Sequence, residues 1–271
     1  MDAALIETIQ VAPAGARICH ALFDFDGTLS LLREGWQQVM TPLMVAALSA
    51  CPQAEPLPEI ERLVSDYIAT STGIQTIHQM IWLAEAVAQR GGQALAPEAF
   101  KAAYLARLDQ HIADRLAAVR AGSAPAADYT VPGARETLCW LRQAGVICHL
   151  ASGTDVANVR QEAELLGLNG FFAGIHGALA DWRNYSKAQV IANILADGAI
   201  APAALITFGD GYVEIENTRT AGGVAVGVAT DEAHPGQLDR WKRQRLISAG
   251  AHYILADLRP APTLLKALGV G

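Results

Sequence analysis

The sequence predicts an α/β fold in which helices cover both faces of a parallel sheet, with an all-helical domain inserted after the first strand. Three observations support this expectation. An apolar run at residues 18–23 ends in an acidic segment. Residues 34–120 show only helical spacing of apolar side chains. After residue 133, strand-like and helix-like segments alternate, which is typical of a parallel sheet buried on both faces.

The first part of the chain contains one strand and several helices. Residues 1–17 are expected to form a loosely packed lead-in rich in small residues, followed by the strand at 18–23. Within residues 34–120, one apolar face repeats every three or four residues through Ile74, Ile77, Ile81, Ala84 and Ala88. Pro42 is expected to kink or restart the first helix. Gly, Ser and Pro residues in 122–133 indicate a linker.

Beyond this linker, the period of the apolar pattern switches repeatedly between helix and strand. We expect helices at 134–143, 155–166, 186–196 and 213–220, and strands at 146–151, 171–175, 203–208 and 223–228. Gly167 is expected to end the second of these helices. A strand at 252–255 should form an edge of the sheet, and a short helix should follow Pro260.

Composition excludes several classes of function. The 271 residues are 52% hydrophobic and carry a formal net charge of −7, so the chain can bury a sizeable core and offers no basic surface for nucleic acid. No apolar stretch reaches the length of a membrane span. Asp2 and Glu7 precede any basic residue, which is unlike a secretory signal. The four cysteines lack metal-type spacing, and Cys19 and Cys148 lie in apolar strand runs, which indicates buried reduced thiols and favours a cytoplasmic location.

The segment Asp24-Phe25-Asp26-Gly27-Thr28 is the most informative functional signal. It places two carboxylates two residues apart at the end of a strand, where open α/β sheets bind their ligands. One carboxylate can attack an electrophile while the other transfers a proton. The alternative is an Asp-Gly turn between two strands.

Together with three later segments, this motif resembles the haloacid dehalogenase superfamily, specifically its magnesium-dependent phosphatases. The later segments are Ser152-Gly153-Thr154, Lys187 in Tyr185-Ser186-Lys187, and Asp210-Gly211-Tyr212-Val213-Glu214. The resemblance implies a Rossmann-like α/β core with a mobile helical cap inserted after the first motif. We therefore expect a core formed by residues 1–30 and 131–271, and a cap formed by residues 31–130.

The resemblance also implies a role for each motif residue. Asp24 would be the nucleophile that forms an aspartyl-phosphate, and Asp26 would be the general acid and base. The implied Mg²⁺ ligands are Asp24, the backbone carbonyl of Asp26, Asp210 and Glu214. The implied phosphate-binding groups are Thr28, Ser152 and the backbone N–H of Gly153, with Lys187 as the cation on the phosphate and on Asp24. Ordinary turns, caps or surface positions are the alternatives for Thr28, Ser152, Lys187 and Asp210.

Two positions depart from the pattern of the family. Many relatives have Asp where Glu214 stands, and the longer side chain leaves two roles open: acting through a metal-bound water or orienting Lys187. Ala188 replaces a common proline after the lysine of the third motif. Neither change removes an essential charge.

The cap is expected to determine substrate selectivity. Arg33 and Trp36 lie just past the expected hinge, and Thr72, Gln75 and Thr76 open the third helical segment. Arg33 and Gln75 are the candidate substrate-binding residues. The alternative for Gln75 is a capping box with Thr72, which needs no ligand.

These inferences favour a Mg²⁺-dependent phosphomonoesterase acting on a small phosphorylated metabolite of the sugar or polyol phosphate class. Two alternatives remain: a phosphosugar mutase similar to β-phosphoglucomutase, and a non-catalytic binding protein on the same scaffold. No nucleic acid or membrane partner is expected, and the chain is expected to be a monomer or a homodimer.

Overall fold

The computed structural model describes residues 6–13, 15–179 and 181–271 and divides into two compact units. The core unit comprises 1–34 with 118–271, and the helical unit comprises 35–117. These limits differ from the expected cap boundaries at residues 31 and 130. The Leu31 N–H donates to the Tyr129 carbonyl at 2.9 Å, so the two connecting segments pair with each other and belong to the core unit.

The core unit is built on one seven-stranded sheet with the order β1-β7-β6-β5-β2-β3-β4. All neighbouring strands are parallel except β1 and β7, which pair antiparallel. The strands are β1 (Glu7–Thr8), β2 (His20–Phe23), β3 (Ile147–Asp155), β4 (Phe172–Ala178), β5 (Leu205–Gly209), β6 (Val224–Val228) and β7 (Tyr253–Leu255). The strand order reverses at β2, and such a switch point is where open α/β sheets bind ligands.

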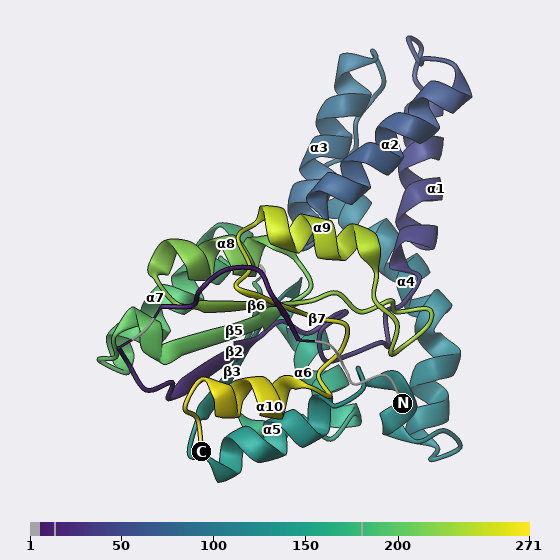
Figure 1. The fold of residues 1–271 in the computed structure, drawn as a ribbon. Coiled ribbons are helices and arrows are strands. Elements are labelled where there is room, and N and C mark those ends of the chain that lie inside the picture. Colours follow the sequence, from purple (N-terminus) through teal and green to yellow (C-terminus); the bar gives the residue numbers. More distant parts are fainter. Residues whose placement is uncertain (1–5, 14, 180) are drawn as a thin grey trace. The chain divides into compact units, whose positions relative to one another are not determined.

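Helices cover both faces of this sheet, as the sequence predicts (Figure 1). Helices α7 (Lys187–Asp197), α8 (Tyr212–Ala221) and α9 (Arg240–Ser248) lie on one face, and α5 (Ala134–Gln143), α6 (Val156–Leu165) and α10 (Ala261–Ala267) lie on the other. The first face buries Val190 and Ile194 of α7 against Leu22 and Leu205. The connections include four short 3₁₀ helices, at Ala126–Tyr129, Asn169–Phe171, Trp182–Asn184 and Pro202–Ala204.

The helical unit contains α1 (Trp36–Ser49), α2 (Leu57–Ser71), α3 (Thr76–Gln89) and most of α4 (Pro97–Arg120). Its core joins buried side chains from each helix, including Met44, Val64, Met80 and Leu108. Burial of one apolar face per helix is what the spacing of three and four residues predicts. Helix α1 continues through Pro42, so the expected restart does not occur.

The capping box that the sequence offered as the alternative role of Gln75 does not form at the start of α3. Helix α3 begins at Thr76 with Gln75 as its N-cap residue, and no side chain caps it. The Thr72 hydroxyl instead donates to the Ile68 carbonyl at 2.9 Å, in the last turn of α2. Thr72 therefore closes the preceding helix, because Ser and Thr hydroxyls readily bond to a carbonyl four residues back.

Two elements were not expected from the sequence. Residues 7 and 8, assigned to the lead-in, form β1, so β7 lies inside the sheet instead of at its edge. Helix α9 was also missed. The expectation for residues 1–5 and 14 lies outside the described part of the chain. Within the described residues, no helix combines the length and the apolar character needed to cross a bilayer.

Candidate active site

The candidate site lies where three adjacent strands end. In the parallel register, Phe23 of β2 lies between Leu150 of β3 and Phe208 of β5. Because the strands are parallel, the residues that follow these positions emerge at the same edge of the sheet. The rings of Phe23 and Phe208 stack with centroids 4.8 Å apart and fix the two strand ends against each other. Asp24 directly follows Phe23 in the chain, and Asp210 lies two residues after Phe208, so the stacked rings help to fix both aspartates.

Asp24 is held by a buried lysine. The Lys187 ammonium lies 2.8 Å from Asp24 Oδ2 and 2.7 Å from Glu214 Oε2. All three side chains are buried, and Lys187 is only 4% exposed. Lys187 is the first residue of α7, whose N-cap Ser186 accepts a hydrogen bond from the Gln189 N–H at 3.1 Å. The start of α7 therefore fixes the position of the lysine.

The Glu214 carboxylate lies near Asp24 and accepts hydrogen bonds from two partners. Its Oε1 accepts from the Gly211 N–H at 2.7 Å, at the start of α8, while Oε2 accepts from Lys187. One carboxylate thus closes a helix N-terminus and orients the lysine. This geometry favours the orienting role among the two that the sequence left open.

Three buried carboxylates form a cluster that could hold a metal ion. One oxygen from each of Asp24, Asp210 and Glu214 lies within 4.8 Å of the others. An all-oxygen donor set of this kind suits Mg²⁺ or Ca²⁺. The backbone at Gly27 packs closely here, since a Cβ added to that residue would lie 2.2 Å from Asp210 Oδ2. Gly27 has a φ of 74°, so glycine is required both for the turn and for this approach.

Burial and neighbouring charges shift the pKa values of Asp24 and Lys187. Burial raises the pKa of Asp24 well above its ordinary value; Lys187 opposes this shift, and Glu214 and Asp210 add to it. Burial alone would lower the pKa of Lys187, but Asp24 and Glu214 outweigh it and raise that pKa. A divalent cation at the cluster would favour the carboxylate form of Asp24.

Asp26 has different surroundings from Asp24. Its Oδ2 accepts from the Thr154 hydroxyl at 2.9 Å and from the Ser152 hydroxyl at 3.4 Å. Its Oδ1 lies 3.8 Å from Nε of Arg33, and its side chain is 25% exposed. A carboxyl group that is partly open to solvent and not bonded directly to a lysine can exchange protons with a ligand or water.

Arg33 belongs to the core unit, not to the helical unit in which the sequence placed it. Its guanidinium forms a buried ion pair with Glu162 of α6, with Nη2 and Oε1 2.6 Å apart. Its Nε also lies 3.1 Å from both Glu162 carboxylate oxygens. Arg33 is therefore close to the site through Asp26, while its Nε and Nη2 donate to Glu162.

The predicted phosphate-binding residues lie around the end of β3. Ser152 is buried, and its hydroxyl accepts from the Thr154 N–H at 3.1 Å. Gly153 lies between them in β3. The Thr28 hydroxyl is buried and has no hydrogen-bond partner among the described residues. A buried hydroxyl without a partner is costly, so Thr28 is available for a ligand atom or a water.

Four further residues near the site were not predicted. Thr154 bonds to Asp26, and the Tyr185 hydroxyl donates to the Ser152 carbonyl at 2.8 Å. Lys242 of α9 lies 2.7 Å from Asp210 Oδ2 and 2.6 Å from Glu232 Oε1. The signal that could have identified Lys242 is scarcity, because the chain contains only four lysines.

The remaining candidates lie in the helical unit. Gln75 is buried at the N-terminus of α3, and Trp36 is the first residue of α1. Contact between these side chains and a substrate stays a prediction.

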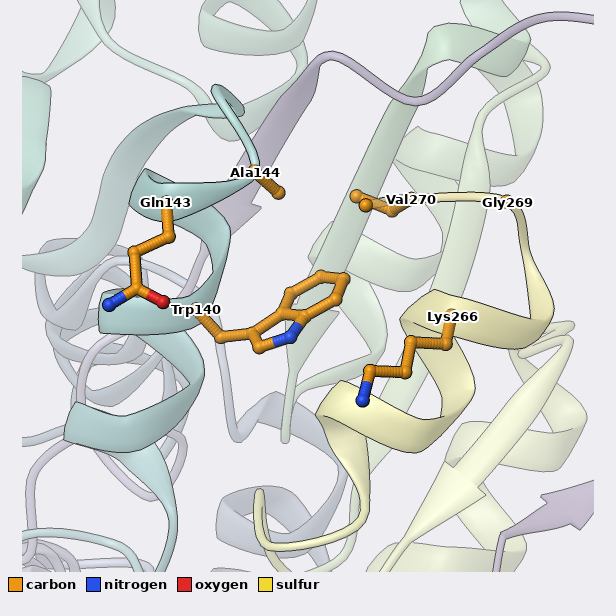
Figure 2. Close-up of a pocket in the computed structure, with 7 residues that line it drawn as sticks. Trp140, Gln143, Ala144, Lys266, Gly269 and Val270 are labelled. Carbon is orange, nitrogen blue, oxygen red and sulfur yellow. The ribbon is translucent and has the colours of Figure 1, made fainter.

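A separate cavity of about 520 Å³ lies between the ends of α5 and α10 (Figure 2). The Trp140 indole projects from α5 toward α10, with Lys266 and Val270 on the other side. The lining residues are Trp140, Gln143, Ala144, Lys266, Gly269, Val270 and Gly271. None of them belongs to the carboxylate cluster, so this cavity is distinct from the candidate site.

Comparison with known proteins identifies the fold. The model of the haloacid dehalogenase-like hydrolase family matches residues 20–222. A predicted phosphoglycolate phosphatase from Haemophilus somnus 129PT is 15% identical, with a TM-score of 0.60 over 93% of this chain and 99% of the other. A β-phosphoglucomutase from Clostridium difficile is 13% identical, with a TM-score of 0.60 over 93% and 97%. A predicted phosphatase from Clostridium acetobutylicum is 16% identical, with a TM-score of 0.58 over 93% and 100%.

At these identities the solved structures establish a shared fold. Among curated protein sequences, none matches this chain significantly.

Proposed function

The chain belongs to the haloacid dehalogenase-like hydrolases, and on this premise we propose that it is a Mg²⁺-dependent phosphatase acting on a small phosphorylated metabolite. The observation that carries the proposal is the contrast between two aspartates. Asp24 is buried and paired with Lys187, and Asp26, two residues later in the chain, is more exposed. Two carboxyl groups with such different surroundings are suited to different roles in one reaction.

In the proposed reaction, a carboxylate oxygen of Asp24 attacks phosphorus and the bond from phosphorus to the leaving oxygen breaks. Asp26 gives its proton to that oxygen, which leaves as an alcohol. Water then attacks the resulting aspartyl-phosphate, and Asp26 takes a proton from it. Inorganic phosphate departs and Asp24 is restored as a carboxylate.

Residues around the two aspartates provide binding and charge. We assign Lys187 to Asp24 and the transferring phosphoryl group, because its ammonium already lies 2.8 Å from Asp24. Ser152, the Gly153 N–H and Thr28 would donate hydrogen bonds to phosphate oxygens, and the buried Thr28 hydroxyl supports this assignment. Glu214 would keep Lys187 in place.

Asp24, the Asp26 carbonyl and Asp210 would hold Mg²⁺, with the Lys187-orienting carboxylate of Glu214 beside them, and the close set of carboxylate oxygens supports this part of the proposal. When bound, Mg²⁺ supplies positive charge that reduces the repulsion between a carboxylate nucleophile and a phosphate dianion. A sugar or polyol phosphate is the proposed substrate class. The four cysteines are free thiols in the structure, which supports a cytoplasmic location as part of the proposal.

The proposal is tested by measuring phosphate release from a panel of phosphorylated metabolites. Wild-type protein with Mg²⁺ should release phosphate, an excess of EDTA should stop the release, and Mg²⁺ should restore it. Asp24→Asn should abolish turnover while the circular-dichroism melt shows a folded protein, because an amide does not act as the nucleophile. Substantial release by folded Asp24→Asn would contradict the assignment.

The same panel distinguishes the phosphosugar mutase. A mutase would convert one sugar phosphate into its isomer, depend on a bisphosphate, and accumulate a long-lived phosphoenzyme. Absence of turnover on every compound would favour a binding protein on the same scaffold.

A further inference from the structure

Lys242 lies in the same carboxylate cluster as Lys187, but on the opposite side of Asp210. It stands in the first turn of α9, where the Asp239 carboxylate accepts hydrogen bonds from the Trp241 and Lys242 N–H groups at 2.8 and 3.0 Å. This cap fixes the start of the helix. The Lys242 side chain is 5% exposed, which is unusual for lysine unless it is paired.

The ammonium of Lys242 bridges two carboxylates. It lies 2.7 Å from Asp210 Oδ2 and 2.6 Å from Glu232 Oε1. A Cβ on Gly27 would lie 3.1 Å from the same Glu232 oxygen, so this glutamate also faces the turn of the first motif. Lys242 and Glu232 are therefore built into the site, although they lie outside the four motifs.

The charges of the cluster show what this arrangement does. Four carboxyl groups, those of Asp24, Asp210, Glu214 and Glu232, surround two ammonium groups, those of Lys187 and Lys242. Lys187 pairs with Asp24, the proposed nucleophile. Among the described residues, Lys242 contacts one of the proposed metal ligands, Asp210, and it contacts Oδ2 of that carboxylate.

Two consequences follow for a divalent cation. The lysine fixes the rotamer of Asp210 and leaves Oδ1 as the oxygen not engaged by Lys242. Its positive charge also repels a cation bound to Asp210, and that repulsion is strong because both charges are buried. Glu232 offsets part of the repulsion and holds the lysine in place.

We propose that Lys242 is an internal cation that positions Asp210 and weakens divalent-cation binding at the site, with Glu232 as the residue that balances it. This inference rests on the proposed function, because it concerns the same metal site. The inference means that a lysine and a glutamate outside the four motifs adjust the affinity for Mg²⁺, and that Lys242 already offsets part of the negative charge near Asp210 before Mg²⁺ binds.

The test is Mg²⁺ binding to the full chain, measured by isothermal titration calorimetry without substrate. Lys242→Met keeps the length of the side chain and removes its charge, and it should bind Mg²⁺ about tenfold more tightly, or better. Glu232→Gln removes the balancing charge and should bind about tenfold more weakly. The double variant Lys242→Met/Glu232→Gln should return to within about threefold of wild type.

The matched control is Arg243→Met on the same helix. Arg243 pairs with Glu7 and makes no contact with the carboxylate cluster among the described residues. This variant loses one positive charge, as Lys242→Met does, and its ion pair with Glu7 lies away from the cluster, whereas Lys242→Met loses its pairs with Asp210 and Glu232. Its Mg²⁺ affinity should stay within about twofold of wild type, which separates the effect of the site from a change in net charge.

Thermal melts give a second readout. Metal-free Lys242→Met should melt below wild type, because Asp210 and Glu232 lose their counter-ion, and Mg²⁺ should raise its Tm by more than it raises that of wild type. If Lys242→Met does not fold, Mg²⁺ binding by Glu232→Gln tests the inference instead. Weaker Mg²⁺ binding than wild type supports it, and unchanged or tighter Mg²⁺ binding overturns it.

Unchanged or weaker Mg²⁺ binding by folded Lys242→Met would overturn the inference while leaving the phosphatase proposal intact. Wild-type protein that binds no Mg²⁺ would instead overturn the metal site itself, and the inference with it.

Discussion

Asp24 and Asp26 are two residues apart, yet their surroundings differ. Asp24 is buried against Lys187, while Asp26 is partly exposed and bonds to the Thr154 and Ser152 hydroxyls. The direct lysine contact and the metal-type cluster give Asp24 the charge environment of a nucleophile. Hydroxyl donors and solvent access suit Asp26 for proton transfer.

Arg33 is expected to act through Asp26. Its ion pair with Glu162 is buried, with side-chain exposures of 6% on both partners. Arg33→Met should remove a buried counter-ion of Glu162 and lower the free energy of unfolding by about 3–5 kcal/mol. Urea denaturation measures this loss. The double variant Arg33→Met/Glu162→Met should recover much of it.

Turnover by these variants tests the positioning role separately. Arg33→Met/Glu162→Met should lower kcat similarly on para-nitrophenyl phosphate and on the true substrate, and it should shift the pH profile of the acid–base step. A loss confined to the true substrate would show that Arg33 contacts the substrate, as the sequence first indicated.

The positions of Asp24, Asp26 and Asp210 at strand ends could be predicted from the sequence, because strand, turn and acid are adjacent in the chain, and their roles stay proposals. Lys187 was found through its motif, not through any local pattern. Lys242 and Glu232 could not be found this way. They reach the cluster only through the packing of α9 and the loop before it, and one buried lysine leaves no periodic signal.

At the level of elements, the start of α7 places the key lysine. Helix α7 begins at Lys187, and its N-cap Ser186 bonds to the Gln189 N–H. Ser186→Ala should lower the free energy of unfolding by about 0.5–2 kcal/mol, whereas Ser186→Gly should cost only a few tenths. Equal losses for the two variants, measured by urea denaturation, would show that the side-chain hydrogen bond contributes nothing.

The elements that were not predicted from the sequence, β1 and α9, have no regular spacing of apolar residues. Strand β1 contains two residues and exists through pairing with β7, a partner about 245 residues away in the chain. Helix α9 buries only Lys242 and Leu246 and carries several basic residues, so it shows no apolar stripe. Helices α5, α6, α7 and α8 were predicted well, because each has a clear apolar face and a glycine within two residues of its end.

At the level of the whole molecule, neutral histidines in the core unit should make stability depend on pH. His149 of β3 lies 3.1 Å from His20 of β2, and their rings stack. Burial, together with His20 and His176, lowers the pKa of His149 to about 4. An unfolded histidine has a pKa of about 6.5. Between these values the unfolded chain binds a proton that the native state does not, so stability falls as pH decreases.

His149→Gln removes this contribution. Compared with wild type, its Tm should become relatively more favourable as pH falls from 7 toward 4, and the difference should level off below about pH 4. Thermal melts at closely spaced pH values measure this. A constant Tm difference between the two proteins over the whole range would contradict the prediction.

The helical unit is expected to determine substrate choice while the core performs the chemistry. The motifs account for a phosphoryl group, but they contain nothing that recognises the rest of a metabolite. Gln75 is the candidate contact, because it is buried at the start of α3 without capping that helix through its side chain. Gln75→Ala should lower kcat/KM on the true substrate far more than on para-nitrophenyl phosphate, which lacks the polar groups.

Gln79 provides the matched control for this prediction, since it is a buried glutamine of the same helix that donates to the Ser71 hydroxyl at 3.1 Å. Gln79→Ala should lower the Tm through loss of that bond and change both substrates alike. Selectivity is then measured as the ratio of kcat/KM between the two substrates for wild type and both variants. An unchanged ratio in Gln75→Ala would place recognition of the metabolite elsewhere in the molecule.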